Sequence, residues 1–287
     1  MQNWSETYRG TVPPWECDVT EHFTIAYYFD RLEEGGRNLA ETLGLSGLLG
    51  GGGFARRLDV RFARELRAGS SFHIESAPLS APGAVDGGLR LGHRFVDSAN
   101  GEIVTWIAES WDLPAGALSP ERCSAIAGRL GVWEGPAAEQ RPEPASTAGF
   151  IPTARGRVKT TDLDADGRFA LAAIVLRLTD ACLQSGSAIG MDGAFLEANR
   201  RGFSTFELAL RISGALALDQ PYLVESGIAH LGNSSLRLIH RMCDPRSGAE
   251  VAHLGQYGVN LDLEARRPAR WPDEIRTRAA ALVVPMA

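Results

Sequence analysis

The chain has 287 residues, of which 44% are hydrophobic and 22% charged, so it can form a buried core and is unlike a disordered chain. Its formal net charge of −6 argues against a nucleic-acid-binding protein, because phosphate recognition requires a dense surface of lysine and arginine. The cysteines are scattered and form no Cys-x-x-Cys pair, so we expect neither a metal site nor a disulfide framework.

In chain order, the first residues, MQNWSETYRG, lack the cationic start and apolar run of a signal peptide. No later stretch of about 18 apolar residues could span a bilayer, so we expect a cytoplasmic protein that does not insert into a membrane. An extended segment at residues 8–15 then leads into the acidic loop WECDVTEH. After this loop, apolar residues recur at helical spacing and predict a long helix: Phe23, Ala26, Phe29, Leu32, Leu39 and Leu43.

Two glycines interrupt this helical pattern. Gly35 and Gly36 cost helix stability relative to alanine, so we expect them to permit close backbone packing. Alternating apolar residues at 58–62 and 72–74 begin a series of strands. The segment SPERCSAIAGRL predicts a closing helix, with Ser119 as the N-cap and Pro120 at its first position.

The second half of the chain repeats the first. HFTIAYYFDRLEEGGRNLAETLGL aligns without a gap on RFALAAIVLRLTDACLQSGSAIGM, and LDVRFARELRAGSSFHIES on LALRISGALALDQPYLVES. LRLGHRFVDSANGEIV and LRLIHRMCDPRSGAEV share 8 of 16 residues, where ordinary usage gives about one. His93 and His240 fall at equivalent positions, and we expect both to be framework residues. Two copies of one domain explain this order.

We therefore predict an α+β fold with a domain at residues 1–133, a linker rich in proline, alanine and glutamate at 134–150, and a second domain at 151–287. In each domain, an antiparallel sheet would wrap around one long helix, because the helix has no other apolar surface to pack against. This is the hotdog architecture. A single such sheet exposes an edge, and the tandem copy would supply its partner.

The segment TVPPWECDVTEHFTIAYYFDRLEE resembles the start of hotdog-fold acyl-CoA thioesterases of the 4-hydroxybenzoyl-CoA thioesterase type. That family has a strand, a Trp, the motif Asp-x-x-Gly-His, an apolar residue, Asn or Thr, and a helix containing a Tyr. FARELRAGSSFHI is similar to the strands that follow in the family, and RRPARWPDEI to its closing segment. The matching positions of the first segment are Trp15, Asp18, His22, Phe23, Thr24 and Tyr28.

The resemblance implies that the protein hydrolyses an acyl-CoA thioester to a free acid and coenzyme A. Asp18 would be the nucleophile or the general base, while His22 would orient the loop and Thr24 hold water. One carboxylate can suffice, because a thiolate with a pKa near 8.5 departs without a strong general acid. Free N–H groups at the start of the helix would stabilise the oxyanion. Spacing alone favours a helix N-cap as the role of Asp18, because aspartate is common at that position.

Two departures from the family pattern bear on this prediction. Glu21 stands where the family has Gly, which could alter the turn before the helix. In the second copy, DLDADGRFA keeps Asp164 and Gly167 but has Arg168 in place of His. We therefore expect the first copy to be the active one and the second a scaffold, with a catalytic role for Asp164 left open.

For substrate binding we select Tyr28 and three arginines, since coenzyme A is anionic; at least one of Tyr27 and Tyr28 should also lie in the core. No separate cofactor is expected, because coenzyme A is part of the substrate. Two alternatives are a hotdog hydratase or dehydratase, whose motif is missing, and a non-catalytic acyl-CoA-binding protein. Either a monomer or a homodimer is compatible with the sequence. The selected arginines are Arg56, Arg57 and Arg168.

Overall fold

The computed structural model describes residues 3–18, 20–46, 56–80, 88–113 and 118–287. The chain forms two compact units. Unit 1 comprises Met1–Ala137 and Arg211–Ser213, and unit 2 comprises Ala138–Leu210 and Gly214–Ala287. Among the helices that the structure describes, none has the length and apolarity needed to cross a membrane.

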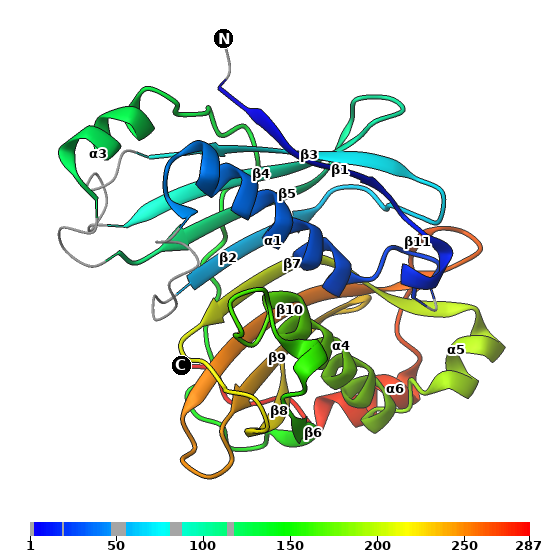
Figure 1. Cartoon of the computed structure of the whole chain (residues 1–287). Helices are drawn as coiled ribbons and strands as arrows, with labels where there is room; N and C mark the ends of the chain where they lie inside the picture. The colour runs from blue at the N-terminus through cyan, green and yellow to red at the C-terminus, as the bar shows by residue number, and fades with distance from the viewer. Residues whose placement is uncertain (1–2, 19, 47–55, 81–87, 114–117) are drawn as a thin grey trace. The chain divides into compact units, whose positions relative to one another are not determined.

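Unit 1 is an antiparallel sheet with one long helix packed on it (Figure 1). The strand order is β1-β3-β4-β5-β2, and α1 contacts β1 and β3. A short 3-10 turn, η1, separates β1 from α1. The elements are β1 (Ser5–Thr11), η1 (Pro14–Glu16), α1 (Ile25–Thr42), β2 (Arg56–Phe62), β3 (Ser71–Pro78), β4 (Leu89–Asp97), β5 (Ile103–Trp111) and α3 (Pro120–Ala127).

Unit 2 has the same sequence of a strand, a 3-10 turn, a long helix, further strands and a closing helix. Its strand order is β7-β10-β9-β8-β6, and α4 contacts β6, β8 and β9. These arrangements confirm the predicted α+β fold class. The elements are β6 (Ile151–Arg157), η2 (Thr160–Asp162), α4 (Leu171–Ala188), α5 (Gly193–Asn199), β7 (Arg201–Ile212), β8 (Pro221–Leu231), β9 (Ser235–Cys243), β10 (Glu250–Asp262), β11 (Arg267–Pro268) and α6 (Asp273–Ala280).

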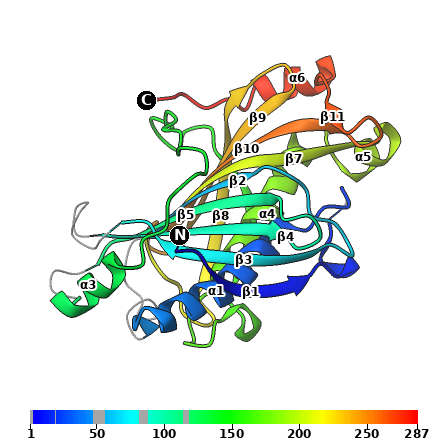
Figure 2. The ribbon, with the colours of Figure 1, turned by 90° about the horizontal axis from the view of Figure 1, so that it is seen from above.

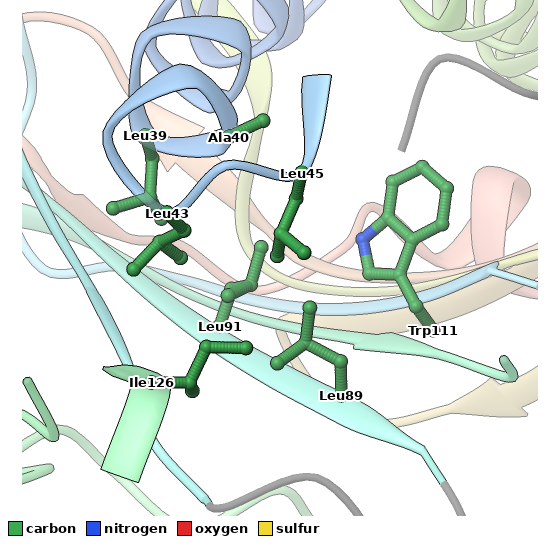
Figure 3. Close-up of a cluster of buried hydrophobic side chains, with 8 residues drawn as sticks. All are labelled: Leu39, Ala40, Leu43, Leu45, Leu89, Leu91, Trp111 and Ile126. Carbon is green, nitrogen blue, oxygen red and sulfur yellow. The ribbon is translucent and has the colours of Figure 1, made fainter. Parts of the chain in front are cut away.

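One cluster of buried hydrophobic side chains in unit 1 joins the end of α1 to β4, β5 and α3. The side chains of this cluster point toward one another in Figure 3, and Figure 2 shows α3 lying beyond the ends of the strands. As predicted, α3 has Ser119 as its N-cap, whose hydroxyl accepts a hydrogen bond from the backbone of Arg122 at 3.3 Å. The cluster consists of Leu39, Ala40, Leu43, Leu45, Leu89, Leu91, Trp111 and Ile126.

The two mid-helix glycines of α1 differ in their surroundings. A Cβ atom on Gly35 would lie 3.1 Å from the Thr7 hydroxyl oxygen, so this glycine does permit a close approach between α1 and β1. A Cβ atom on Gly36 would meet no described atom within 4 Å. The packing prediction is therefore confirmed for Gly35 and wrong for Gly36.

A buried chain of hydrogen bonds crosses the sheet of each unit at equivalent positions. In unit 1 the Ser76 hydroxyl lies 2.8 Å from the Thr7 hydroxyl and 2.7 Å from Nδ1 of His93. In unit 2 the corresponding distances are 2.6 and 2.7 Å, and the residues are those aligned by the repeat: Thr153, Ser226 and His240. Both histidines are fully buried.

The hydrogen-bond chains of the two units differ beyond the histidine. His93 Nε2 lies 3.2 Å from Glu109, which also receives a hydrogen bond from Arg56, whereas unit 2 has Gln256 at the position of Glu109. Burial alone would raise the pKa of Glu109, but the charges of Arg56 and His93 and their hydrogen bonds lower it to about 2. Burial lowers the pKa of His240 to about 4, so this histidine is neutral at pH 7. Unit 1 thus has an ionic network where unit 2 has a neutral one.

Part of the segment predicted as a linker is anchored to unit 2. Arg141 makes two hydrogen bonds of 2.7 Å to Glu207, and Glu143 lies 2.9 Å from both Arg237 and His253. The backbone N–H of Ala287 donates to the carbonyl of Glu143 at 2.9 Å. Residues 141–143 and the C-terminal end are therefore integral to unit 2.

Candidate active site

The loop between β1 and α1 is closed by the side chain of Asp18. Oδ1 of Asp18 accepts hydrogen bonds from the Thr20 backbone at 2.8 Å, the Thr20 hydroxyl at 2.6 Å and the His22 backbone at 3.3 Å. The Asp18 N–H donates in turn to the His22 carbonyl at 2.9 Å. Helix α1 begins later, with Thr24 as an N-cap whose side chain makes no capping bond. Asp18 therefore caps its own loop, and the alternative that it caps the helix is wrong.

Glu21 adopts the left-handed backbone conformation that glycine favours. Its φ is 66°, and Gly167, at the equivalent position in unit 2, has a φ of 75°. The unit 2 loop is also closed in the same way, since Oδ1 of Asp164 accepts from the backbones of Asp166 at 2.8 Å and Arg168 at 2.9 Å. Glu21 thus keeps the backbone conformation of the glycine that it replaces, at a cost in backbone strain.

An ion pair places a second carboxylate beside the loop. Nε2 of His22 lies 2.9 Å from Oε1 of Glu65, and Arg67 contacts the other oxygen of Glu65 at 3.2 Å. The His22 side chain is 13% exposed and that of Glu65 is 36% exposed, so the pair is open to solvent on one side. Asp18 is also exposed. The carboxylate of Asp18 and the His22–Glu65 pair could therefore both meet a ligand.

Glu65 is absent from our sequence-based list of site residues, although two signals mark it. It is the glutamate of FARELRAGSSFHI, a segment already matched to the thioesterase family. The repeat also places Ala215 opposite it, just as it places Arg168 opposite His22. Both members of the pair are thus replaced together in unit 2. Histidine and glutamate that change together between copies indicate a shared role.

Backbone contacts hold the two partners in register. The N–H of Phe23, the residue after His22, donates to the carbonyl of Leu66, the residue after Glu65, at 2.8 Å. At the start of the loop, the carbonyl of Glu16 accepts from the N–H of Thr24 at 2.9 Å. The loop is therefore attached to the segment after β2 as well as to the start of α1.

A second ion pair anchors the loop from α1. The Glu16 carboxylate pairs with Arg31 at 2.8 Å, and Asp162 pairs with Arg177 at 2.7 Å in unit 2. Each of these ion pairs joins the turn before the loop to the long helix of its own unit. This anchor is therefore part of the framework that the units share, unlike the His22–Glu65 pair.

The other predicted site residues occupy varied positions. Tyr28 is 3% exposed and lies in the core, while Arg56 packs against Glu109 and the ring of Trp111. Arg57 pairs with Asp59 at 3.0 Å. Arg168 is half-buried, and its backbone closes the unit 2 loop. The structure thus places Asp18, His22 and Thr24 in one loop, with Arg56 and Arg57 in contacts outside it.

No cluster of metal-binding side chains occurs in the part of the chain that the structure describes. The loop presents the Asp18 carboxylate and the imidazole of His22, which is paired with Glu65. A carboxylate can attack a carbonyl carbon or deprotonate water, and a histidine held by a second carboxylate can transfer protons. Groups of this kind can hydrolyse an ester or a thioester.

Comparison with known proteins gives one family match, and it covers unit 2. Residues 158–279 match the family described as the thioesterase-like superfamily. No curated protein matches the chain. The family match therefore extends over less than half of the chain and leaves out the Asp18 loop.

Similar solved structures cover nearly the whole chain. A candidate oleoyl thioesterase from Lactobacillus plantarum has a TM-score of 0.66 and 14% identity, with 93% of this chain and 98% of that chain covered. An acyl-ACP thioesterase from Bacteroides thetaiotaomicron has a TM-score of 0.63 and 11% identity, with 90% and 98% covered. The 12:0-ACP thioesterase from Umbellularia californica has a TM-score of 0.63 and 14% identity, with 91% and 98% covered. The chain therefore has the hotdog fold of these proteins, and its second half is similar in sequence to the thioesterase-like superfamily.

Proposed function

We propose that the protein is an acyl-CoA thioesterase whose active site is the Asp18 loop of unit 1. The observation that carries this proposal is the pairing of His22 with Glu65 at 2.9 Å in the same loop that presents the Asp18 carboxylate. The match of residues 158–279 to the thioesterase-like superfamily and the shared fold support thioester hydrolysis as the reaction. The choice of coenzyme A over an acyl-carrier protein rests on the family resemblance of the sequence.

Asp18 has the reacting role in this proposal. The hydrogen bonds that its side chain receives from the described residues all go to Oδ1, which leaves Oδ2 to act on the thioester. As a nucleophile, Oδ2 forms a bond to the acyl carbon while the carbon–sulfur bond breaks, and water then hydrolyses the mixed anhydride. As a base, Oδ2 takes a proton from water, the hydroxide attacks the acyl carbon, and the carbon–sulfur bond then breaks to release the thiolate.

The His22–Glu65 pair supplies proton transfer. With Glu65 accepting from Nε2–H, the neutral imidazole has its lone pair on Nδ1 and is held in one orientation. The thiolate of coenzyme A is a good leaving group, because its pKa is near 8.5, so it departs without a strong general acid. Nδ1 of His22 would accept a proton from the water that hydrolyses the mixed anhydride and then pass that proton to the thiolate. The start of a helix carries a partial positive charge, so the first N–H groups of α1 would stabilise the oxyanion.

Unit 2 serves as a scaffold in this proposal. Its loop keeps Asp164, which closes the turn, but has Arg168 and Ala215 in place of the histidine and the glutamate. The carboxylate of Asp164 is therefore explained by the turn alone. Arg57 and Arg168 stay predicted contacts for the phosphates of coenzyme A, whereas Arg56 already forms an ion pair with the buried Glu109.

The test follows free thiol released from short, medium-chain and aromatic acyl-CoAs, with acyl-carrier-protein thioesters in parallel. We expect Asp18→Asn to lower kcat at least about 100-fold because it removes the reacting carboxylate, and Glu65→Gln to lower it about 10-fold or more. Asp164→Asn is the matched control and should keep activity. Equal losses in Asp18→Asn and Asp164→Asn would contradict the assignment to unit 1. Binding without thiol release would indicate a non-catalytic acyl-CoA-binding protein.

The role of Asp18 can be tested by chemical trapping. Borohydride reduces an acyl–aspartate anhydride to homoserine, which mass spectrometry detects in the peptide that contains residue 18. Homoserine at this position during turnover would identify Asp18 as the nucleophile, and turnover without it would indicate the base. A change in double-bond absorbance without thiol release would instead show a hydratase or dehydratase.

A further inference from the structure

A line of hydrogen-bonded polar side chains crosses the whole sheet of unit 1, with one residue from each strand. The line follows the strand order of the sheet, β1-β3-β4-β5-β2 (Figure 1). Its first four members are buried, so the hydrogens between them are shared among side chains rather than with water. From β1 to β2 the residues are Thr7, Ser76, His93, Glu109 and Arg56.

The carbonyl of Ile74 sets the direction of the hydrogen bonds at one end of the line. The Thr7 hydroxyl donates to this carbonyl at 3.3 Å. Because a hydroxyl has one hydrogen to donate, Ser76 is the donor in its 2.8 Å contact with Thr7. The hydrogen of Ser76 is then already used. In the 2.7 Å contact between Ser76 and Nδ1 of His93, the ring nitrogen must therefore be the donor.

Glu109 sets the hydrogen on the other ring nitrogen. Burial opposes ionisation of this carboxyl group, but Arg56 and His93 lower its pKa to about 2, so it is a carboxylate at neutral pH. A carboxylate only accepts hydrogen bonds, so Nε2 of His93, which lies 3.2 Å from Oε2 of Glu109, also carries a hydrogen. An imidazole ring with two N–H groups is an imidazolium ion.

Unit 2 repeats the line as far as the histidine and then departs from it. Thr153 donates to the carbonyl of Val224 at 3.3 Å, and Ser226 lies 2.6 Å from Thr153 and 2.7 Å from Nδ1 of His240. The same count of hydrogens places an N–H at Nδ1 of His240. Gln256 replaces the glutamate, however, and an uncharged amide does not hold a second proton on the ring. Burial lowers the pKa of His240 to about 4, so its ring is neutral with the hydrogen on Nδ1.

The other groups packed around His93 add no charge on its face of the sheet, among the described residues. Glu75 and Arg94, on the same two strands as the serine and the histidine, point to the opposite face and pair with each other at 2.5 Å. Tyr28 is the titratable residue among the buried positions of α1, and burial raises its pKa, so it is uncharged. The carboxylate of Glu109 is therefore the charged group that His93 contacts.

We propose that His93 is an imidazolium ion at neutral pH and that it acts as a proton-dependent switch in the sheet of unit 1. Loss of the Nδ1 proton to solvent leaves a lone pair, which can only accept a hydrogen bond from Ser76. Ser76 then accepts from Thr7 in turn, so the Thr7 hydroxyl no longer donates to the carbonyl of Ile74. One proton thus sets the direction of the hydrogen bonds from β4 to β1.

Thr7 is a place where such a change affects the backbone. The register between β1 and β3 shifts between Glu6 and Tyr8, so Thr7 lies in an irregularity of the strand. The side chain of Asn38 on α1 donates to the Thr7 carbonyl at 2.8 Å. An imidazolium ion held in the folded state contributes stability that is lost as the pH rises through its titration. We therefore expect alkaline pH to loosen β1 and its contact with α1.

The test is an NMR measurement of the side-chain nitrogens in the ¹⁵N-labelled full-length protein. At pH 7 we expect two protonated nitrogens in His93 and one, Nδ1, in His240. His240 is the internal control, because it ends an equivalent threonine–serine line without a carboxylate. A single protonated nitrogen in His93 would overturn the proposal, and so would a doubly protonated His240, because the carboxylate would then not determine the charge. The wild-type spectrum decides this point without any variant.

Thr7→Val tests the coupling along the line, since valine keeps the shape of threonine and removes the hydroxyl. Ser76 is then free to donate to Nδ1, so we expect the pH at which His93 releases its proton to fall by about half to one unit. Thr153→Val, the matched change in unit 2, should leave this pH unchanged. Circular dichroism identifies a temperature at which each variant is folded. The same titration midpoint for His93 in Thr7→Val and the wild type would refute the switch.

Discussion

Replacing Glu109 with glutamine tests the ionic network at the centre of unit 1. The Glu109 side chain is 2% exposed and contacts both Arg56 and His93. Glutamine has nearly the same shape, and Gln256 occupies the equivalent position in unit 2. The substitution therefore removes the charge while retaining an amide that can hydrogen-bond. It leaves the guanidinium of Arg56, which is 17% exposed, without its carboxylate partner in the network.

The magnitude follows from the pKa of Glu109. Its fall from 4.5 to about 2 corresponds to about 3 kcal/mol of stability, since one pKa unit is worth about 1.4 kcal/mol. Because the folded-state pKa is the lower one, this stability is fully present above about pH 5 and is lost as the pH falls toward 2. We therefore expect Glu109→Gln to destabilise unit 1 by about 3 kcal/mol at pH 7, and by progressively less below pH 5.

The assay is urea unfolding of the wild type and the variant at several pH values between 7 and 3. Glu102→Gln is the matched control, because Glu102 pairs with Arg64 at 2.7 Å but both side chains are about half exposed. Such a surface pair contributes less than about 1 kcal/mol. The reasoning fails if Glu109→Gln costs no more than Glu102→Gln at pH 7, or if its cost is the same at every pH.

Two further predictions concern the backbone. Glu21→Gly should stabilise the protein by about 0.5–1 kcal/mol in chemical unfolding, because relief of the left-handed conformation outweighs the added flexibility of glycine. Gly167→Ala should destabilise the protein for the opposite reason. A loss of stability in Glu21→Gly would contradict this account. Gly35→Ala should cost about 1–3 kcal/mol, since the Thr7 hydroxyl it would crowd is held by a buried hydrogen bond. Gly36→Ala should add up to about 1 kcal/mol, and similar melting temperatures for the two alanine variants would refute this account.

The fold class could be predicted because each copy shows two strong periodicities, one helical and one alternating. The apolar spacing from Phe23 to Leu43 matches a helix that begins at Ile25, and the residues before it belong to the loop and the N-cap. The periodicity of the sequence could not show which of Gly35 and Gly36 allows α1 to approach β1, because that depends on which of the two faces β1. That choice is made by tertiary packing.

The candidate site was predicted only in part. The loop residues Asp18, His22 and Thr24 are near one another in sequence, so a local motif brings them together. Glu65 comes from the segment after β2, and its ion pair with His22 is a tertiary contact that no local motif predicts. Arg56 was selected for substrate binding because it lies in a cationic segment, but the structure pairs it with the buried Glu109. The sequence alone does not reveal that contact.

The contacts of residues 141–143 determine where truncations and insertions in this segment can be tolerated. A fragment that started at Ile151 would lose Arg141 and Glu143, which pair with the buried side chains of Glu207 and Arg237. Residues inserted before Arg141 would leave these ion pairs undisturbed. Residues inserted after Arg141 would displace one or both of them. The same anchor receives the backbone of Ala287, so a tag fused to Ala287 would disturb the hydrogen bond between Ala287 and Glu143 within unit 2.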